Sequence, residues 1–165
     1  MADEIDAGAL YRELAPAVLG YLRSERVPDP EDVLGEVFLQ VARDLRRRRF
    51  RGDDAALRRW VFSIAHNRIV DAHRRRTRDR SEPAAEAVEG TGGLRTAGGP
   101  PDPFDQDLVE ALGSLSDDQR EVVVLRFVAD LSIEQVATIT GRTAGAVKAL
   151  QHRGLDNLRR NLGTS

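Results

Sequence analysis

The 165-residue sequence contains no cysteine, one tryptophan and a single lysine, Lys148, among 25 cationic residues. Without cysteine the chain forms neither disulfides nor thiolate metal sites, and it has no thiol nucleophile or thiol switch. No apolar run approaches the roughly 20 residues that a membrane-spanning helix needs. Residues 1–6 are acidic and lack the basic and apolar regions of a signal peptide, so we expect a cytoplasmic protein.

Sequence motifs of catalysis are also missing. There is no P-loop, no GxGxxG and no GxSxG. The three histidines, His66, His73 and His152, form no HExxH pattern. His66 and His73 share a helix face, but no third ligand is evident. The sequence therefore predicts no enzyme, no metal site and no cofactor.

Charge is distributed unevenly along the chain, although the formal net charge is only −2. Residues 58–80 carry eight arginines and two acids, and residues 142–160 carry five bases and one acid. Residues 102–121, between them, carry seven acids and one base. Basic segments attract polyanions even when the whole chain is near neutral. The preference for arginine over lysine fits either a genome rich in G and C or selection for phosphate and base recognition.

A segment rich in glycine and proline divides the chain. Residues 81–106 contain five of the 14 glycines and four of the seven prolines. This composition is typical of a flexible linker. It predicts one domain over residues 1–80 and a second over residues 107–165. Neither shows the alternation of a β-strand, so the predicted fold is all-α: two small helical domains joined by the linker.

Three helices are predicted before the linker. The first has an apolar residue at every fourth position from Leu10 to Leu22. The second begins after Asp29, an N-cap candidate, with Pro30 at its first position and apolar residues at helical spacing as far as Leu45. The third extends from about residue 55 to about residue 76. It has two apolar sides, which indicates packing neighbours on both.

The most specific local pattern lies in residues 132–153. Ser132 and Gln135 match a capping box, Gly141 suits a left-handed turn, and Thr143 can cap the helix that follows. On that second helix the side predicted to face the core carries Val147, Leu150, Gln151, Gly154 and Leu158. The opposite side carries Gly145, Lys148, Ala149 and His152, flanked by Arg142 and Arg153. This pattern is typical of a helix-turn-helix, whose second helix enters the DNA major groove.

Two features of this pattern stay open. A plain helical hairpin with a solvated, charged face is the alternative to a DNA-binding motif. Nothing in the sequence explains Gly154, which costs a helix about 1 kcal/mol relative to alanine.

In the first half of the chain, the run DLRRRRFR over residues 44–51 fits either a DNA contact or a solvated loop.

Taken together, the two halves resemble the two-domain, extracytoplasmic-function (ECF) sigma factors of bacterial RNA polymerase. The segment DPEDVLGEVFLQVAR, residues 29–43, is similar to the family's acidic-aliphatic helix that docks on the β′ clamp. LRRWVFSIAHNRIVDAHRRR, residues 57–76, resembles the segment that melts and reads the promoter −10 element. SIEQVATITGRTAGAVKALQHR, residues 132–153, resembles the helix-turn-helix that reads the −35 element.

The resemblance implies roles for individual residues. The residues facing the clamp would be Asp32, Glu36 and Gln40. The −10 set would be Trp60, Asn67, Arg68, Arg74, Arg75, Arg76 and Arg78, in which Trp60 and Asn67 surround a flipped base and the last four hold phosphates. The −35 set would be Arg142, Thr143, Lys148, Ala149, His152 and Arg153.

The implied partners are core RNA polymerase, through its β′ clamp and β flap, promoter DNA and, in many members, an anti-sigma factor. The expected function is promoter-specific initiation through binding alone. Ala149, Leu150 and Leu155 depart from the family's usual −35-reading residues, and Gly35 stands where a larger polar residue is common. From the residues alone, two other classes stay open: a stand-alone helix-turn-helix regulator with an N-terminal sensing domain, and a protein-only adaptor.

Overall fold

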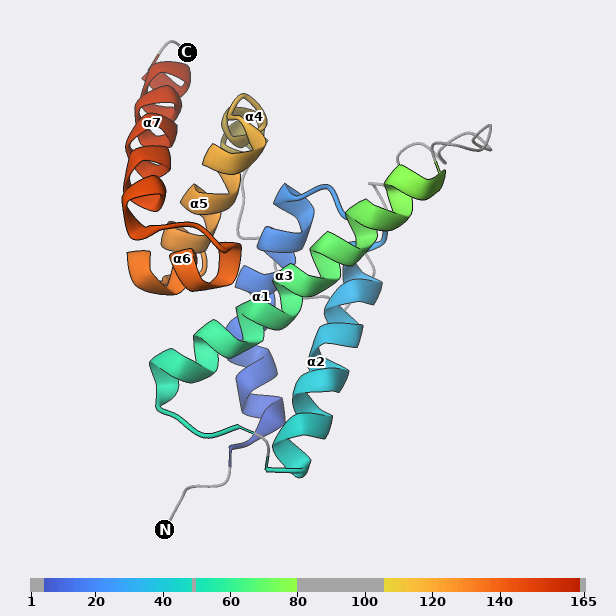
Figure 1. Ribbon diagram of the computed structural model, residues 1–165. Helices are drawn as coiled ribbons and strands as arrows, with labels where there is room; N and C mark the ends of the chain where they lie inside the picture. The colour runs from blue at the N-terminus through green and yellow to red at the C-terminus, as the bar shows by residue number, and fades with distance from the viewer. Residues whose placement is uncertain (1–4, 49, 80–105, 164–165) are drawn as a thin grey trace.

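A computed structural model describes residues 5–48, 50–79 and 106–163. These residues form seven helices and no strand, which confirms the predicted all-α class. The helices fall into two groups, α1–α3 and α4–α7 (Figure 1). The predicted linker lies outside the described residues except for Gln106, which begins α4, and the domain limits stay a prediction. In the part of the chain that the structure describes, no helix has both the length and the apolar character to cross a membrane.

The first group consists of α1 (Ala7–Ser24), α2 (Pro30–Arg46) and α3 (Asp54–Asp79), which pack on one another. The apolar series of α1 is fully buried: Leu10, Leu14, Val18 and Leu22. α2 begins at Pro30 as predicted, but a side-chain cap from Asp29 is not formed. Asp29 has a φ of 51°, whereas a capping side chain reaches the first turn from an extended backbone.

Helix α3 has the two apolar sides that the sequence predicts. Val61 and Ile64 are buried on one side, and Phe62 and Ile69 on another. Trp60 is only partly buried. The two sides have different neighbours because α3 packs against α1 and α2 and also against α6 of the second group.

The second group consists of α4 (Gln106–Gly113), α5 (Asp117–Phe127), α6 (Ile133–Thr140) and α7 (Ala144–Gly163). α6 begins with the predicted capping box between Ser132 and Gln135. Gly141 ends it with a φ of 70°, in the left-handed region. The Thr143 hydroxyl then accepts a hydrogen bond from the N–H of Ala146 at 3.1 Å. These local contacts confirm the predicted helix-turn-helix.

Gly154 lies where α7 crosses α5, and the crossing explains its presence. A Cβ at this position would lie 2.7 Å from Cγ2 of Val123 in α5, which is closer than carbon atoms approach in proteins. Glycine therefore lets the two helices pack closely around a buried valine. The close contact therefore carries a cost in helix propensity of about 1 kcal/mol relative to alanine.

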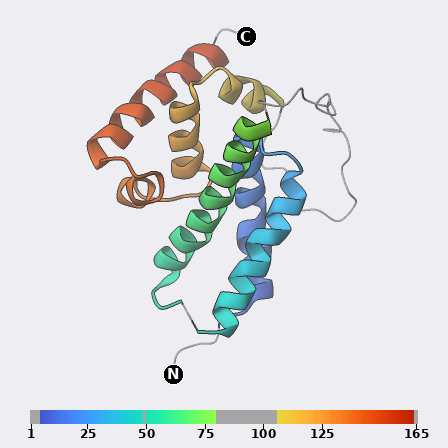
Figure 2. The same ribbon diagram turned by 45° about the vertical axis from the view of Figure 1, so that its right-hand side comes forward.

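The two groups pack against each other instead of standing apart (Figure 2). α1 contacts α4 and α5, and α3 contacts α6. Side chains of each group also bind the backbone of the other. Arg58 Nη1 donates to the carbonyl of Ala129 at 3.2 Å, and Gln135 Nε2 donates to the carbonyl of Ala55 at 3.0 Å. No sequence pattern predicted this contact.

Candidate nucleic-acid interface

The helix-turn-helix is held in place by an arginine of α5. Arg126 Nη1 donates to the carbonyl of Leu131 at 2.7 Å, and its Nε donates to Oε1 of Gln151 at 2.9 Å. One side chain thus ties the turn before α6 to the middle of α7. Sequence reasoning missed this role, and the available signal was a cation within the apolar run of residues 122–127. Arg126 is best described as a positioning residue for α7.

The outer face of α7 presents the residues that the sequence placed there. Lys148, His152 and Arg153 are exposed, and Ala149 is partly buried beside them. Within the described residues neither Lys148 nor Arg153 makes an ion pair. Their charges are therefore available to phosphates or to guanine edges. Exposed Gly145, near the start of α7, leaves the backbone open to close approach.

Arg142 and Thr143, the other two predicted −35 residues, are built into the motif. Arg142 Nη2 donates to Asp118 Oδ1 at 2.6 Å, and its Nη1 donates to Glu121 Oε1 at 3.1 Å. The Thr143 hydroxyl caps α7. Arg142 thus holds the turn between α6 and α7 to α5, and Thr143 caps the start of α7. Their contact with DNA stays a prediction.

Three predicted −10 residues follow one stripe of α3. Trp60, Asn67 and Arg74 are seven residues apart, which is close to two helical turns. At the start of the stripe, Trp60 stacks on Phe50 of the α2–α3 loop, with ring centroids 5.1 Å apart and planes 27° apart. Sequence reasoning had placed Phe50 only in a run that fits a DNA contact or a loop. Asn67 is exposed midway along the stripe.

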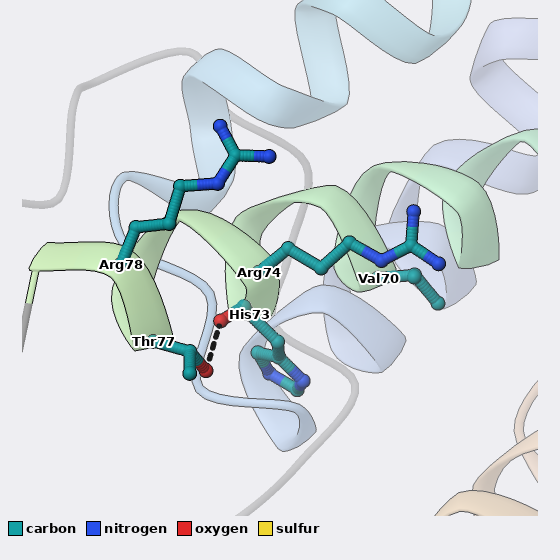
Figure 3. A pocket seen from close by; sticks show the side chains of 5 residues that line it. All are labelled: Val70, His73, Arg74, Thr77 and Arg78. Carbon is teal, nitrogen blue, oxygen red and sulfur yellow. Dashed lines mark hydrogen bonds between the residues drawn. The ribbon is translucent and has the colours of Figure 1, made fainter.

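The far end of α3 is strongly basic. Arg74, Arg75, Arg76 and Arg78 are all exposed there. Figure 3 shows a shallow hollow beside them, lined by Val70, His73, Arg74, Thr77 and Arg78. The Thr77 hydroxyl donates to the carbonyl of His73 at 3.0 Å, so the wall of this hollow is part of the helix itself. Clustered guanidinium groups of this kind suit the phosphates of a nucleic-acid backbone.

The predicted polymerase-binding residues lie on one stripe of α2, and a −10 residue contacts them. Arg68 Nη1 donates to Glu36 Oε2 at 3.2 Å, and Arg68 Nη2 donates to Gln40 Oε1 at 3.2 Å. Asp32 is exposed one turn before Glu36. Leu39, beside them, is 57% exposed. The structure thus joins two predicted sets into one continuous surface across α2 and α3.

A buried polar cluster lies between the two helix groups, which no sequence pattern indicated. Glu121 of α5 accepts a hydrogen bond from the Tyr21 hydroxyl at 3.0 Å and lies 3.4 Å from His66 Nδ1. Burial alone would raise the pKa of Glu121, but hydrogen bonds from His66, Arg142 and Tyr21, together with the charge of His66, lower it. Burial and the neighbouring Glu121 raise the pKa of Tyr21 well above its ordinary value.

Glu25, at the end of α1, belongs to the same cluster. Burial and the proximity of Glu121 raise its pKa to about 8. Its neighbour Arg120 is 5% exposed and donates to Asp117 at 2.8 Å. Glu25 Oε1 and Arg120 Nε are buried without a hydrogen-bond partner among the described residues.

The histidines serve separate contacts. His66 belongs to the buried cluster, His73 Nε2 lies 3.0 Å from the carbonyl of Glu25, and His152 is exposed on α7. Within the described ranges, no three His, Asp or Glu side chains are grouped to hold a metal ion.

Comparison with known proteins identifies the family. The description "Sigma-70 region 2" matches residues 10–79, and "Sigma-70, region 4" matches residues 111–160. The ECF RNA polymerase sigma factor ShbA of Streptomyces griseus is 32% identical over 173 residues, covering 96% of this chain and 90% of ShbA. The ECF sigma factor SigD of Mycobacterium tuberculosis is 37% identical over 133 residues, covering 78% of this chain. The chain therefore belongs to the ECF RNA polymerase sigma factors.

Chain length and fold complete the comparison. The matched part spans 61% of the length of SigD. The sigma factor RpoE of Bartonella quintana, solved in complex with the anti-sigma factor NepR, superposes with a TM-score of 0.74. The match covers 94% of this chain and 96% of RpoE at 24% sequence identity, so the two share a fold.

Proposed function

We propose that the chain is a cytoplasmic promoter-recognition subunit that binds core RNA polymerase reversibly and directs initiation at specific promoters. One observation carries the proposal. The two matched sigma regions coincide with α1–α3 and α4–α7, and each group presents an exposed basic face. The chain acts through binding rather than catalysis. The match of α1–α3 to sigma region 2 disfavours a stand-alone regulator with a sensing domain.

The −35 duplex would be read by α7. Lys148, His152 and Arg153 would approach base edges in the major groove, where lysine and arginine bind guanine. The N-terminus of α7 would meet a phosphate, because its free N–H groups and dipole favour an anion. Phosphate contacts fix the register of the helix on the duplex, and base contacts provide the sequence preference. Ala149 leaves room for close approach beside these side chains.

The −10 strand would be held along α3. Unstacking one base costs a few kcal/mol, and stacking on an aromatic ring returns about 1–3 kcal/mol. The stacked pair of Phe50 and Trp60 offers such a ring at the start of the stripe, and Asn67 offers hydrogen bonds further along. The arginines at the end of α3 would then hold the backbone. This order accounts for an aromatic start and a basic end on one helix.

Core polymerase would dock on the surface formed by α2 and Arg68. Asp32, Glu36 and Gln40 would face the β′ clamp, with exposed Leu39 adding apolar contact. The second helix group would contact the β flap. An anti-sigma factor is part of the proposal because RpoE, which shares this fold, was solved bound to one.

Reconstituted transcription tests the function. Core polymerase and genomic fragments should give initiation at specific sites only when the chain is added. Glu36→Lys should abolish this dependence, because it reverses the charge of the docking surface and places a second cation beside Arg68. Circular dichroism and thermal unfolding would confirm that the variant is folded.

Glu13→Lys is the matched control, since it also reverses an exposed acid that pairs with an arginine of α3, here Arg58, but it lies on α1 and not on α2. It should leave core binding unchanged. Unaltered core affinity in Glu36→Lys would overturn the docking assignment, and the absence of chain-dependent initiation would overturn the proposed function.

A further inference from the structure

Thr77 has more arginine neighbours in the sequence than any other serine or threonine of this chain. Arg74, Arg75 and Arg76 precede it and Arg78 follows it, and no other hydroxyl residue has an arginine at each of the three preceding positions. In the proposed function these arginines hold backbone phosphates, and the threonine among them has no role. The threonine hydroxyl is a group that protein kinases modify.

The side chain of Thr77 is open to solvent. It is exposed in the last turn of α3, two residues before the helix ends at Asp79. Its hydroxyl donates to the carbonyl of His73 at 3.0 Å, and the loss of such an exposed bond costs little. The end of a helix opens at a small fraction of the free energy of global unfolding. An enzyme can therefore draw this hydroxyl out of the helix without unfolding α1–α3.

The arginines before Thr77 are free to attract a partner. Arg74, Arg75 and Arg76 are all exposed, and none of the three makes an ion pair within the described residues. Thr77 and Arg74 border the same shallow hollow (Figure 3), since residues three apart on a helix are neighbours. Kinases select substrates partly by charge pattern, and carboxylates bind guanidinium groups well. This segment therefore suits the acidic substrate groove of an arginine-directed kinase.

We propose that Thr77 is a phosphorylation site for an arginine-directed protein kinase, with ATP as the phosphate donor. Oγ1 of Thr77 would attack the γ-phosphorus of ATP, and the hydroxyl proton would pass to a base of the kinase. A new bond between Oγ1 and phosphorus forms as the bond from the γ-phosphorus to the β,γ-bridging oxygen breaks, and ADP leaves. The product carries a phosphate within the basic end of α3.

A phosphate on Thr77 would compete with DNA for the same cations. Its charge near −2 offsets about half of the four positive charges within residues 74–78. Arg74 lies one turn before Thr77, where its guanidinium can pair with the phosphate and is then lost to a DNA phosphate. Phosphorylation would thus weaken the hold of α3 on the −10 strand. This consequence, unlike the modification itself, rests on the proposed function.

Thr138 of α6 provides a matched comparison. It is also exposed, and its hydroxyl also donates to the carbonyl four residues earlier, that of Glu134, at 3.0 Å. No arginine lies within three residues of Thr138. The two threonines therefore share exposure and a local hydrogen bond and differ in their arginine neighbours.

Incubation of the full chain with Mg²⁺, ATP and an arginine-directed serine/threonine kinase tests the site. The chain should take up one phosphate, and fragment mass spectrometry should place it on Thr77. Thr77→Val, which keeps the branched shape of the side chain, should abolish the uptake, whereas Thr138→Val should leave it unchanged. The assignment would be overturned by no uptake, by equal uptake at Thr138, or by uptake that persists at Ser81 in Thr77→Val.

Fluorescence anisotropy with a labelled single-stranded oligonucleotide then measures the consequence for binding. At about 0.1 M salt the phosphorylated chain should bind about tenfold more weakly than the unmodified chain, with a salt slope smaller by about 1. Thr77→Glu should weaken binding by a smaller factor, because it adds one negative charge. Thr138→Glu, which adds the same charge away from α3, should not. Equal affinity of the phosphorylated and unmodified chains would overturn the effect on DNA.

These experiments separate the modification from the function. Absence of phosphate on Thr77 in a chain that directs initiation normally would overturn the modification and leave the proposed function standing. Phosphorylation of Thr77 in a chain that never directs initiation would support the modification, while overturning the proposed function.

Discussion

The two helix groups build their proposed contact surfaces in different ways. In α4–α7 the exposed cations belong to one helix, and a nearby turn positions that helix. In α1–α3 the surface is assembled from two helices and a loop: Arg68 of α3 binds Glu36 and Gln40 of α2, and Phe50 stacks on Trp60. The second group is therefore a local motif that carries its own proposed reading surface. The first depends on how its helices pack.

The arginines show what this difference implies. In the second group Arg126 and Arg142 are engaged in holding the motif, while Lys148 and Arg153 stay exposed. Support and the proposed recognition thus fall to different residues. In the first group Arg68 does both, since it joins α2 to α3 and lies on the proposed −10 surface. A substitution should separate folding from binding more cleanly in the second group.

The largest effect is expected where recognition and support are separate. Lys148→Ala and Arg153→Ala should each weaken binding of a −35 duplex by about 1–3 kcal/mol without lowering the free energy of unfolding. Arg142→Ala should instead destabilise the chain, because it removes the charged hydrogen bonds to buried Glu121 and to Asp118. Fluorescence anisotropy and chemical unfolding measure the two quantities. Equal losses on every DNA sequence would mean that Lys148 and Arg153 contact only phosphates.

The next effect concerns pH and the contact between the groups. Glu25, with a pKa of about 8 in the folded chain, is faced by Glu121, Arg120 and Asp117 of α5 and by Arg142, and the ring of His73 lies at its carbonyl. Its carboxyl binds a proton more tightly in the folded chain than in the unfolded chain, where its pKa is the ordinary 4.5. The free energy of unfolding should therefore fall as pH rises from about 5 to 8, by at most about 1.4 kcal/mol per unit.

The opposite shift of Glu121 does not cancel this trend. Its lowered pKa favours the folded chain above its ordinary value of 4.5, and that contribution is lost only as pH falls further. The free energy of unfolding, measured by chemical unfolding from pH 5.5 to 8, should fall with pH in the unmodified chain. In Glu25→Gln the fall should be smaller, since the amide does not titrate. An unchanged slope would assign the effect to another group.

The smallest effects are expected at two glycines. Gly154→Ala should destabilise the chain by about 1–2 kcal/mol, because the new Cβ would lie 2.7 Å from Cγ2 of Val123. Gly35→Ala, on the exposed side of α2 with no atom within 4 Å of the new Cβ, should stabilise it by about 0.5–1 kcal/mol. Thermal unfolding of the pair measures both signs. If both substitutions raised the melting temperature, helix propensity rather than packing would govern both positions.

Local signals predicted much of this structure. The capping box at Ser132, the turn at Gly141 and the cap at Thr143 involve residues within a few positions of one another. The failed cap at Asp29 shows the limit of such signals. Residue type alone suits an N-cap, but the backbone at Asp29 is left-handed and turns the side chain away from the first turn.

The candidate surfaces were predicted in part. The residues of α2, α3 and α7 lie on the helix faces that their spacing indicated, and their roles in binding stay predictions. The additional residues come from contacts between distant segments. Phe50 reaches Trp60 across a loop, Arg126 reaches Gln151 across 25 positions, and Tyr21 reaches Glu121 across 100 positions. Periodicity within a helix contains no information about such pairs.

By itself, the sequence determined the helices, their apolar faces, the helix-turn-helix and the separation of basic segments. Each of these follows from interactions over one or two helical turns, where residue type and spacing are sufficient. Only the tertiary structure decided which cations stay exposed and which support the motif, why Gly154 is required, and that the two helix groups pack together around a buried carboxylate. Those outcomes depend on burial and on charge partners that meet only when the chain has folded.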